Sequence, residues 1–238
     1  MNNNFSKENE LLINAHITMA KFLGQVLTTD YEIVIHKIDG EEISIAWLEH
    51  SEVSGRTLNS PITNYALSLI NSDEYLKNDY LTNYKGSVKN KILKSSTLFI
   101  KNSNNDLVGL FCINYDPSIK NNIIDKTINN LKEQLNLINN VDKNSKESLN
   151  NTNHNHELID QPIEKLNLDV EELIEELISK CLNAINLPIN RLTAEEKMKI
   201  IEDLDKNNIF KVKGAVNAVA KHLQISVATT YRYIKKVK

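Results

Sequence analysis

A tract of 22 residues, VDKNSKESLNNTNHNHELIDQP at 141–162, contains only four Val, Leu or Ile residues and is otherwise rich in Asn, Ser and charged side chains. Such a composition cannot bury enough apolar surface to offset the entropy lost when the chain is ordered. The tract therefore predicts a flexible linker between two separately packed parts. The pair His154 and His156 lies inside it, and we interpret these histidines as part of the linker rather than as ligands.

The part before this tract mixes helical and strand-like patterns. Apolar residues recur at helical spacing over 8–28, and SPITNYALSLI at 60–70 predicts a helix with Ser60 as N-cap and Pro61 in its first position. Four β-branched runs, paired into two hairpins, are the expected strands. This order predicts an α+β fold with an antiparallel sheet. The four runs are 31–38, 43–50, 95–102 and 107–116.

The remaining segments are helical in pattern. Residues 121–140 keep apolar residues at helical spacing, and 166–185 combine an apolar stripe with acidic residues opposite. Thr193 and Glu196 have the spacing of a capping box, which predicts the start of another helix. We expect an α+β domain over 8–118, a helix and flexible linker over 119–165, and a helical domain over 166–238.

The totals favour a protein of the cytoplasm. The two cysteines, Cys112 and Cys181, are far apart and form no CxxC pair, which argues against a disulfide framework or a zinc site. No stretch approaches the roughly 18 consecutive apolar residues of a membrane span. The polar start MNNNFSKENE lacks the apolar core of a signal peptide. We therefore expect a cytoplasmic protein that does not associate with a membrane.

Charge is strongly segregated along the chain. Residues 206–238 hold eight Lys or Arg and no Asp or Glu, so this segment carries a charge of +8. Residues 1–205 carry −11, which gives the whole chain its net charge of −3. Clustered cations gain by displacing counterions from a phosphate backbone, so the segment indicates an anionic partner. A basic tail that serves only solubility is the alternative interpretation.

The last two expected helices, 213–223 and 226–237, have the spacing of a helix-turn-helix over 213–237. Ala220 is the small residue that such a unit needs in its first helix, and Ser226 can cap the second helix. The inward stripe of the second helix would be Thr230, Tyr233 and Ile234. Two residues depart from the usual pattern. Gln224 stands in the turn where glycine is usual, and Thr230 stands where an aliphatic residue is commoner.

The outward face of the second helix predicts contact with double-stranded DNA. Small residues there would let the helix enter the major groove, Arg232 would reach a guanine edge or a phosphate, and lysines would follow the backbone. A helical bundle that merely has a basic face is the alternative. The residues that we expect to contact DNA are Ser226, Val227, Ala228, Thr229, Tyr231, Arg232, Lys213, Lys221, Lys235 and Lys236.

The stretch from LTAEEKMKIIEDLD to SVATTYRYIKK, 192–236, resembles the C-terminal helix-turn-helix of the YheO/DauR-type bacterial transcriptional regulators. The stretches YEIVIHKI, VSGRTLNSPITNYAL, DYLTNYKG and LKSSTLFIKNSNNDLVGLFCINYD resemble the PAS-like domain of the same family. The resemblance implies a PAS-like antiparallel-sheet sensor domain followed by an all-α helix-turn-helix domain. It also implies that a small ligand or signal controls DNA binding. The long Asn-rich linker departs from the family pattern.

The α+β domain shows no pattern of an enzyme, since paired carboxylates, Ser/His/Asp spacing and glycine-rich phosphate loops are missing. We therefore expect no catalytic residues and no metal site. His36 is a candidate haem ligand, although a lone histidine in a strand is more often simply packed. Arg56 is a candidate partner for a carboxylate ligand. The expected lining of a ligand pocket is His36, Arg56, Tyr84, Lys85, Ser95, Thr97 and Asn114.

Two interpretations of the acidic-apolar helix at 166–185 stay open at this point. Its stripe either packs on the helix-turn-helix or forms the seam of a homo-oligomer, which would place two recognition helices about one DNA turn apart. Taken together, the sequence predicts a DNA-binding transcriptional regulator controlled by a PAS-like sensor. The alternative is a ligand- or haem-binding sensor that acts through protein partners instead of DNA.

Overall fold

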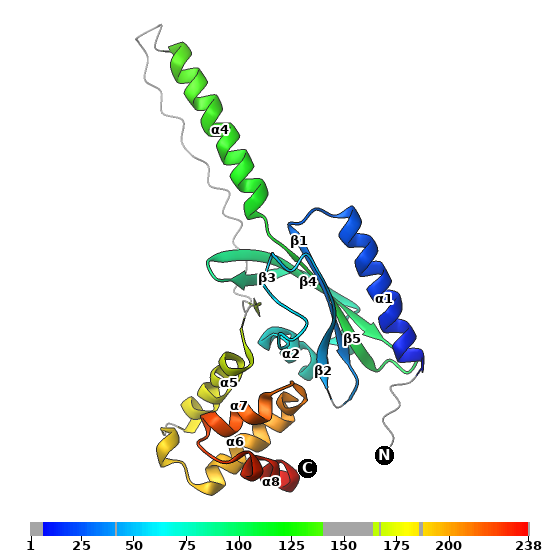
Figure 1. Cartoon of the computed structure of the whole chain (residues 1–238), viewed down its shortest axis with the longest axis vertical. Coiled ribbons are helices and arrows are strands. Elements are labelled where there is room, and N and C mark those ends of the chain that lie inside the picture. Colours follow the sequence, from blue (N-terminus) through cyan, green and yellow to red (C-terminus); the bar gives the residue numbers. More distant parts are fainter. Residues whose placement is uncertain (1–6, 41, 140–163, 167, 186–187, 238) are drawn as a thin grey trace.

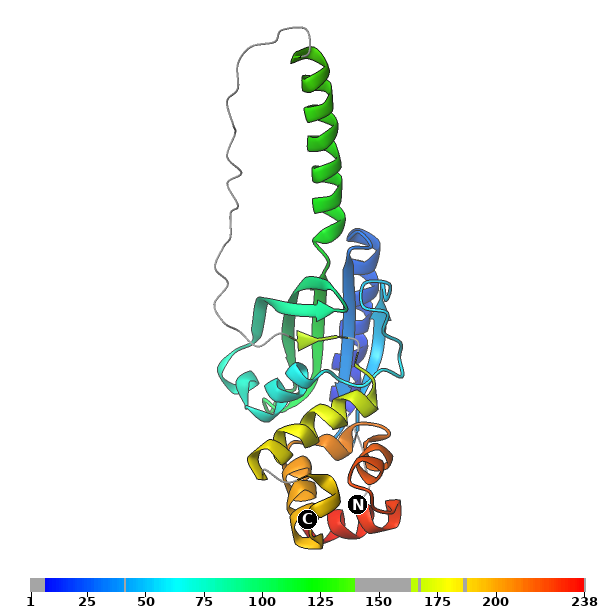
Figure 2. The ribbon, with the colours of Figure 1, turned by 90° about the vertical axis from the view of Figure 1, so that its left-hand side faces the viewer.

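The computed structural model describes residues 7–40, 42–139, 164–166, 168–185 and 188–237. Most of the expected linker, including His154 and His156, lies outside these residues. The described chain forms a sheet part and a helical part, and the helix α4 (Ser118–Asn139) extends from the sheet on the side opposite the helical part (Figures 1 and 2).

One six-stranded sheet forms the centre of the sheet part, in the order β2-β1-β5-β4-β3-β6. The first five strands pair antiparallel, and the two-residue β6 pairs parallel with β3 at the edge of the sheet. The α+β fold with a PAS-like sheet is confirmed. The strands are β1 (Tyr31–Ile38), β2 (Ile43–Glu49), β3 (Tyr80–Val88), β4 (Lys91–Lys101), β5 (Leu107–Tyr115) and β6 (Glu164–Lys165).

The two faces of the sheet pack against different elements because successive side chains of a strand point to opposite faces. Ile33, Ile35 and Phe111 face the helix α1 (Lys7–Val26), whose buried Ile13 completes this cluster. Val34, Leu110 and other alternate residues face the opposite way, towards α2 (Asn64–Asn71), and belong to one large cluster. This second face carries the polar groups considered below.

The same cluster continues into the helical part, so one apolar core joins the two parts. The stripe of α5 supplies Leu173, Ile174 and Ile178, which are fully buried and lie with the core residues of α6 and α7. The stripe therefore packs within its own chain. The elements are α5 (Val170–Ile185), η1 (Ile189–Arg191), α6 (Ala194–Lys206), η2 (Ile209–Lys211), α7 (Ala215–His222) and α8 (Val227–Val237).

Polar contacts also join the two parts. The side-chain amide of Asn71, at the end of α2, donates to the carbonyl of Asn207 at 2.9 Å. The amide of Asn208 donates to Oδ1 of Asn71 at 2.6 Å. Ile43 and Val212 form an isolated parallel bridge. The helical part is thus held against the end of α2 and the start of β2.

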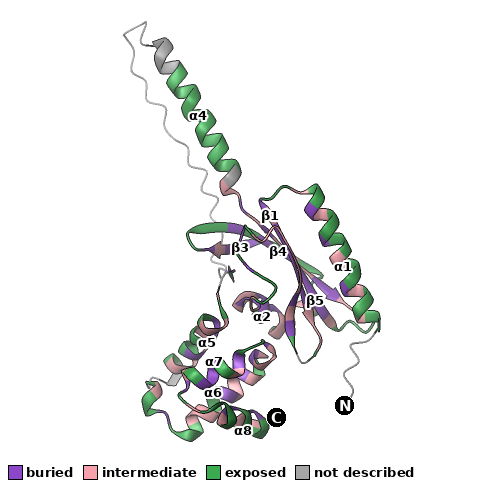
Figure 3. Ribbon diagram, viewed as in Figure 1, coloured by how far each residue is buried: buried purple, intermediate pink, exposed green. Residues whose placement is uncertain are grey.

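Helix α4 has a different environment. Every described side chain from residue 120 to residue 134 is exposed, and Figure 3 shows this helix standing away from the rest of the described chain. Its exposed apolar residues include Ile124, Ile128 and Leu131. An apolar stripe without a partner in the described chain is unusual, because burial of such a face supplies most of a helix's stability in water.

Two details of the chain differ from the expectations. β3 is a strand that the sequence pattern did not predict. The N-cap of α2 is Thr63, whose hydroxyl accepts from the amide of Ala66 at 3.1 Å, and not Ser60. The hydroxyl of Ser60 instead accepts from the amide of Thr57 at 2.9 Å and so closes a turn in the loop before α2. The capping box of Thr193 and Glu196 at the start of α6 is confirmed.

Candidate functional site

The turn between α7 and α8 depends on Gln224, whose φ of 54° lies in the left-handed region. Glycine is usual in such turns because it adopts this conformation without strain. Here Gln224 adopts it, and the chain then closes back on the first helix through a 3.0 Å hydrogen bond from the amide of Ile225 to the carbonyl of Ala220. The buried Ala220 permits this close approach. The turn keeps its geometry although its residue is not glycine.

The start of α8 is fixed by Ser226, whose hydroxyl accepts from the amide of Thr229 at 3.1 Å. Thr230, which stands where an aliphatic residue is commoner, is fully buried. Its hydroxyl donates to the carbonyl of Ser226 at 3.2 Å, so the buried oxygen has a partner within the helix. Ile234, one turn further on, is also buried.

The opposite face of α8 is open to solvent. Tyr231 is 59 % exposed, whereas Tyr233 is half-buried against the core, so the two tyrosines lie in different environments. The guanidinium of Arg232 lies 5.6 Å from the centre of the Tyr233 ring. In Figures 1 and 2, α8 lies at the end of the helical part that is remote from the sheet. Exposed residues of this face are Val227, Ala228, Tyr231, Arg232, Lys235 and Lys236, with Thr229 half-buried.

The lysines outside α8 differ in their surroundings. Lys213 is exposed just before α7. Lys221, at the end of α7, pairs with Glu171 of α5 through Nζ and Oε2 at 2.5 Å. Its charge is therefore partly offset by an acidic residue of the same chain. DNA contacts by these lysines, as by the residues of α8, stay a prediction.

A second group of polar residues lies buried on the sheet face that points away from α1. Ser95 donates to Oδ1 of Asn114 at 2.8 Å, and the amide of Asn114 donates to Oε2 of Glu32 at 2.8 Å. The hydroxyl of Ser54 donates to the other oxygen of Glu32. Burial raises the pKa of the Glu32 carboxyl, and these hydrogen bonds and Arg56 lower it in part. The buried carboxyl group of Glu32 thus accepts hydrogen bonds from two side chains, Ser54 and Asn114.

The neighbouring strands add a hydroxyl pair and a thiol to the same face. The hydroxyls of Tyr84 and Thr97 lie 2.8 Å apart, and Oγ1 of Thr97 lies 3.3 Å from Sγ of Cys112. Burial raises the pKa of the Cys112 thiol to about 12, and the nearby Glu164 acts in the same direction. Burial also raises the pKa of Tyr84 well above its usual value. We call Glu32, Ser54, Arg56, Thr63, Tyr84, Ser95, Thr97, Cys112, Asn114 and Glu164 the polar cluster.

Arg56 enters this cluster from the loop between β2 and α2, and only 4 % of it is exposed. Its Nη2 donates to the carbonyl of Pro61 at 2.6 Å, and its Nε has no partner in the described chain. No carboxylate oxygen of a described residue lies within 4.0 Å of the guanidinium. Burial lowers the pKa of Arg56, and the charges of Glu32 and Glu164 oppose that shift.

Glu164 of β6 reaches the cluster from a distant part of the sequence. Its side chain is 3 % exposed, and Oε1 accepts a hydrogen bond of 2.5 Å from the hydroxyl of Thr63. Oε2 has no partner in the described chain. Burial raises the pKa of the Glu164 carboxyl, whereas Thr63, Arg56 and the hydroxyl of Tyr84 lower it. Within the described residues, the buried guanidinium of Arg56 and the buried carboxylate of Glu164 therefore each keep one atom unpaired.

A cavity of about 250 Å³ lies beside Arg56, between the loop that carries it and the start of α5. Its lining includes Gly55, Arg56 and Pro61 on one side and Leu168, Asp169 and Val170 on the other. The cavity is therefore bordered both by the sheet part and by the segment that leads into the helical part.

Five of the expected pocket residues, Arg56, Tyr84, Ser95, Thr97 and Asn114, meet in the polar cluster. Lys85 does not, because it follows Tyr84 directly in β3 and so points to the other face of the sheet.

His36 is 1 % exposed, and its Nδ1 has no partner in the described chain. Burial lowers the pKa of His36 well below its usual value, with Arg56 adding to the shift. The haem hypothesis for His36 stays a prediction.

The pattern of the sequence did not single out Glu32, Ser54, Thr63 or Glu164. For Glu32 a signal was present, because it alternates with Val34 and lies on the same buried face of β1. Glu164 has no such signal, since its partners are about a hundred positions away.

Among the described residues, no group of three or more His, Cys, Asp or Glu side chains is placed to hold a metal ion. None of the described helices has the length and apolar character of a membrane span.

Comparison with known proteins agrees with this division of the chain. Residues 6–133 match the YheO-like PAS domain, which covers more than half of the chain, and residues 173–235 match an HTH domain. This chain belongs to the YheO/DauR-type transcriptional regulators. The PAS match contains α1 to β5 and much of α4, and the HTH match runs from within α5 into α8.

Two relatives of this YheO/DauR-type regulator match along nearly its whole length, and a third matches about a third of it. A protein of Haemophilus influenzae is 26 % identical over 98 % of this chain and 95 % of its own length. YheO of Escherichia coli strain K12 is 24 % identical over 95 % of this chain and 85 % of its own length. The transcriptional regulator DauR of Pseudomonas aeruginosa is 35 % identical over 81 residues, which are 34 % of this chain and 39 % of DauR.

Proposed function

We propose that this YheO/DauR-type regulator binds double-stranded DNA through α8, and that a small ligand in its PAS-like domain controls this binding. The observation that carries the first half is the exposed face of α8. Small residues occupy its start, Tyr231 and Arg232 follow, and two lysines occupy its last turn. A recognition helix in the major groove needs short side chains where it approaches the base edges and cations where it approaches phosphates.

The charge of the segment supports the same assignment. The eight cations of residues 206–238 have no acidic residue among them. Glu171 offsets Lys221, but Lys213, Lys235 and Lys236 are exposed, and no ion pair involving them is present in the described chain. Release of counterions from DNA would therefore favour binding of this face.

The polar cluster supports the second half of the proposal. Buried polar groups are normally hydrogen-bonded, and an unpaired one calls for an explanation, such as a functional role or a bound molecule. Here Nε of Arg56 is unpaired in the described chain, and Arg56 lines a cavity of about 250 Å³; Oε2 of Glu164, in the same polar cluster, is also unpaired in the described chain. Ligand sites combine a cleft or cavity with a few convergent polar groups, and the solvent-open cavity beside the polar cluster has both features.

A homodimer would complete this function, because one small DNA-binding unit seldom provides enough affinity alone. The stripe of α5 is occupied within the chain, so α4 is the better seam. Its apolar residues Ile124, Ile128 and Leu131 follow the alternating four- and three-residue spacing of a coiled coil, and the pattern continues at Leu135 and Ile138. We infer that α4 pairs with α4 of a second copy.

The test is a salt titration of the full chain with a labelled duplex of random sequence. We expect binding at low salt and an affinity that falls linearly on a double-logarithmic plot, with a slope of roughly −0.9 for each phosphate neutralised. A chain that ignores duplex DNA at low salt would overturn the DNA half of the proposal. It would favour instead a sensor that acts through protein partners.

A further inference from the structure

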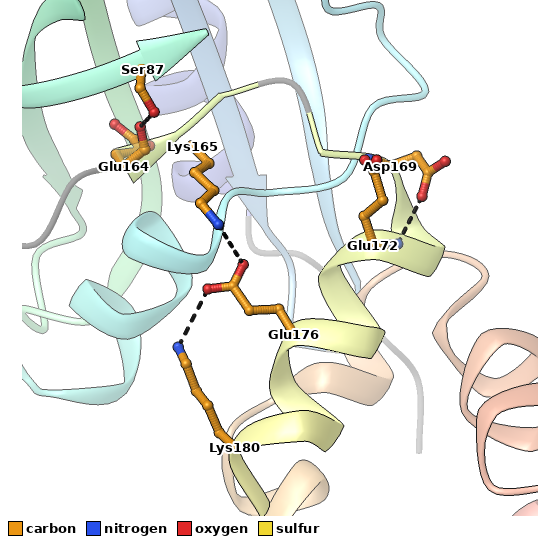
Figure 4. Close-up of polar contacts among 7 residues, drawn as sticks. All are labelled: Ser87, Glu164, Lys165, Asp169, Glu172, Glu176 and Lys180. Atoms are coloured by element: carbon orange, nitrogen blue, oxygen red, sulfur yellow. Dashed lines mark hydrogen bonds and ion pairs between the residues drawn. The ribbon is translucent and has the colours of Figure 1, made fainter. Parts of the chain in front are cut away.

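The strand β6 is a weak attachment by its backbone alone. It has two residues, pairs with Gly86 and Ser87 of β3, and lies at the edge of the sheet. Figure 4 shows its main-chain contact, in which the hydroxyl of Ser87 donates to the carbonyl of Glu164 at 3.3 Å. The amide of Leu166 donates to the carbonyl of Ser87 at 3.0 Å. Because these backbone contacts are few, the side chains of Glu164 and Leu166 must supply much of the attachment of the segment.

The space for β6 is provided by Gly86. A methyl group at Gly86 would lie 2.5 Å from the hydroxyl of Ser95 and 3.3 Å from Cδ1 of Leu166. Leu166 is 2 % exposed and packs with Val88 and Leu93. The edge of the sheet is thus shaped to receive this segment, with one apolar and one acidic side chain inserted.

Of the two inserted side chains, the acidic one is the costly one. A carboxylate loses much of its hydration on burial and regains stability only through close partners. Glu164 has one close hydrogen bond, from Thr63, and its second oxygen has no partner in the described chain. The guanidinium of Arg56 lies more than 4.0 Å from the Glu164 carboxylate.

A free carboxylate would not have this restriction. Arginine binds carboxylates best with two parallel hydrogen bonds, and Nε of Arg56 is unused in the described chain. The cavity of about 250 Å³ beside Arg56 has room for a small molecule. Arg56 lines this cavity and Thr63 does not, so a ligand that binds both residues must also take the place that the Glu164 carboxylate occupies beside Thr63.

The segment is coupled closely to the DNA-binding part. Four residues after β6, Asp169 and Glu172 cap the start of α5 with reciprocal hydrogen bonds of 2.8 and 2.9 Å. Lys165 lies 3.7 Å from Glu176 of α5, as drawn in Figure 4. The stripe of α5 packs against α7, the first helix of the helix-turn-helix. Movement of β6 would therefore reach α7 through one rigid helix.

We propose that Glu164 is a built-in occupant of the ligand site, and that a small carboxylate-bearing molecule displaces it by binding Arg56 and Thr63. Displacement releases β6 from the sheet and changes the position of α5, and with it the helix-turn-helix. The proposal rests on the proposed function, since it names the ligand class and the path by which the sensor acts. Coupling of this kind requires that the ligand favour the released state over the docked state.

The first test uses acetate, which corresponds to the part of the side chain that Glu164→Ala removes. We expect acetate, compared with chloride at equal ionic strength, to raise the Tm of Glu164→Ala by about 3 °C at ten times its dissociation constant. Wild type and Glu164→Gln should shift by less than 1 °C, because their sites remain filled. In Glu164→Ala combined with Thr63→Val, the shift should fall to less than half.

Equal shifts in Glu164→Ala and Glu164→Gln would overturn the proposal, and so would a folded Glu164→Ala without any shift. Inorganic phosphate is the second arm of this test. A shift with phosphate and none with acetate would contradict the assignment to a carboxylate. These outcomes do not depend on DNA, so they remain decisive even if the full chain proves not to bind duplexes.

The second test follows the coupling in the full chain. Hydrogen exchange of residues 164–178 should be at least five-fold faster in Glu164→Ala than in Glu164→Gln. Affinity for duplex DNA should change at least five-fold in the same variant. Lys180→Ala, which removes only the exposed pair with Glu176 inside α5, is the matched control and should change neither. If wild type binds DNA and Glu164→Ala matches Glu164→Gln in both measurements, the coupling is wrong while the proposed function stands.

Discussion

The hydroxyl of Thr63 donates a hydrogen bond of 2.5 Å to the carboxylate of Glu164, although 101 positions separate the two residues. The same hydroxyl accepts from the amide of Ala66 at 3.1 Å and so caps α2. One side chain thus joins the helix on the sheet face to the segment that leads into the helical part. Loss of this hydroxyl would therefore affect both the start of α2 and the attachment of β6.

Thr63→Ala should therefore lower the free energy of unfolding by about 2–4 kcal/mol, from the lost cap and from a buried carboxylate without its donor. Thr63→Ser keeps the hydroxyl and is the matched control, with an expected loss of about 1 kcal/mol or less. Urea denaturation of the full chain measures both values. Equal losses in the two variants would show that the hydroxyl does not have this double role.

The turn of the helix-turn-helix gives a prediction in the opposite direction. Because Gln224 has a φ of 54°, Gln224→Gly should raise the free energy of unfolding by up to about 1 kcal/mol, the strain outweighing the added freedom of the unfolded chain. Gln224→Val should lower it by about 1–2 kcal/mol, since a β-branched residue tolerates this conformation least. A higher free energy of unfolding for Gln224→Val than for Gln224→Gly would contradict the left-handed conformation of this residue.

The buried thiol of Cys112 predicts a specific dependence on pH. Its pKa is raised from 9.0 to about 12, so the thiol's contribution is complete below pH 9 and is lost as the pH rises towards 12. Between about pH 8 and about pH 10.5, wild type should lose about 2 kcal/mol more stability than Cys112→Val. The comparison cancels the other groups that titrate in this range. Parallel pH profiles for the two proteins would place the thiol in contact with water.

Helix α4 allows a test of the homodimer. Ile128→Asp combined with Leu131→Asp places charges in the apolar stripe, which is costly in a paired state and harmless on an exposed helix. We expect the mass measured by light scattering to fall from two chains to one. Asn130→Asp, on the same exposed helix but outside the stripe, should keep two chains. A single chain in wild type would refute this seam.

Substitutions at the two tyrosines of α8 allow DNA binding to be tested separately from packing of the helix. Tyr231 is 59 % exposed, so Tyr231→Ala should change stability by less than about 0.5 kcal/mol while it weakens binding to DNA. Tyr233 packs on the core, so Tyr233→Ala should cost about 1–3 kcal/mol of stability. Thermal unfolding and anisotropy with a duplex distinguish the two effects. The assignment fails if Tyr231→Ala is the less stable variant.

The helix-turn-helix could be predicted in detail because its signals are local. Ser226, Thr230 and Ile234 follow one another at four-residue spacing, Ala220 lies in the preceding helix six residues before Ser226, and each has the position that the pattern predicts. Even the unusual Gln224 preserves the turn, since a left-handed residue other than glycine costs only about 1–2 kcal/mol.

The strand β3 was missed for an equally physical reason. A bulge lies between Leu81 and Tyr84, where Asn83 has a φ of 59°, and it interrupts the two-residue alternation that marks a strand. Because no strand was predicted over 80–88, the sequence could not show that Tyr84 and Lys85 point to opposite faces of the sheet, and Lys85 was placed in the pocket with Tyr84. The role of Glu164 was beyond prediction, because nothing near it in sequence indicates Thr63 or Arg56 as its partners.

The most direct test of the central claim is selection of bound duplexes from a random library by the full chain, followed by affinity measurements on the selected sequence. We expect an enriched sequence. Arg232→Ala should lose discrimination against single base changes, worth about 1–3 kcal/mol at the contacted base, while Lys236→Ala should weaken all duplexes about equally. An account in which α8 reads DNA would be contradicted if no sequence were enriched, or if Lys236→Ala alone changed the preferred sequence.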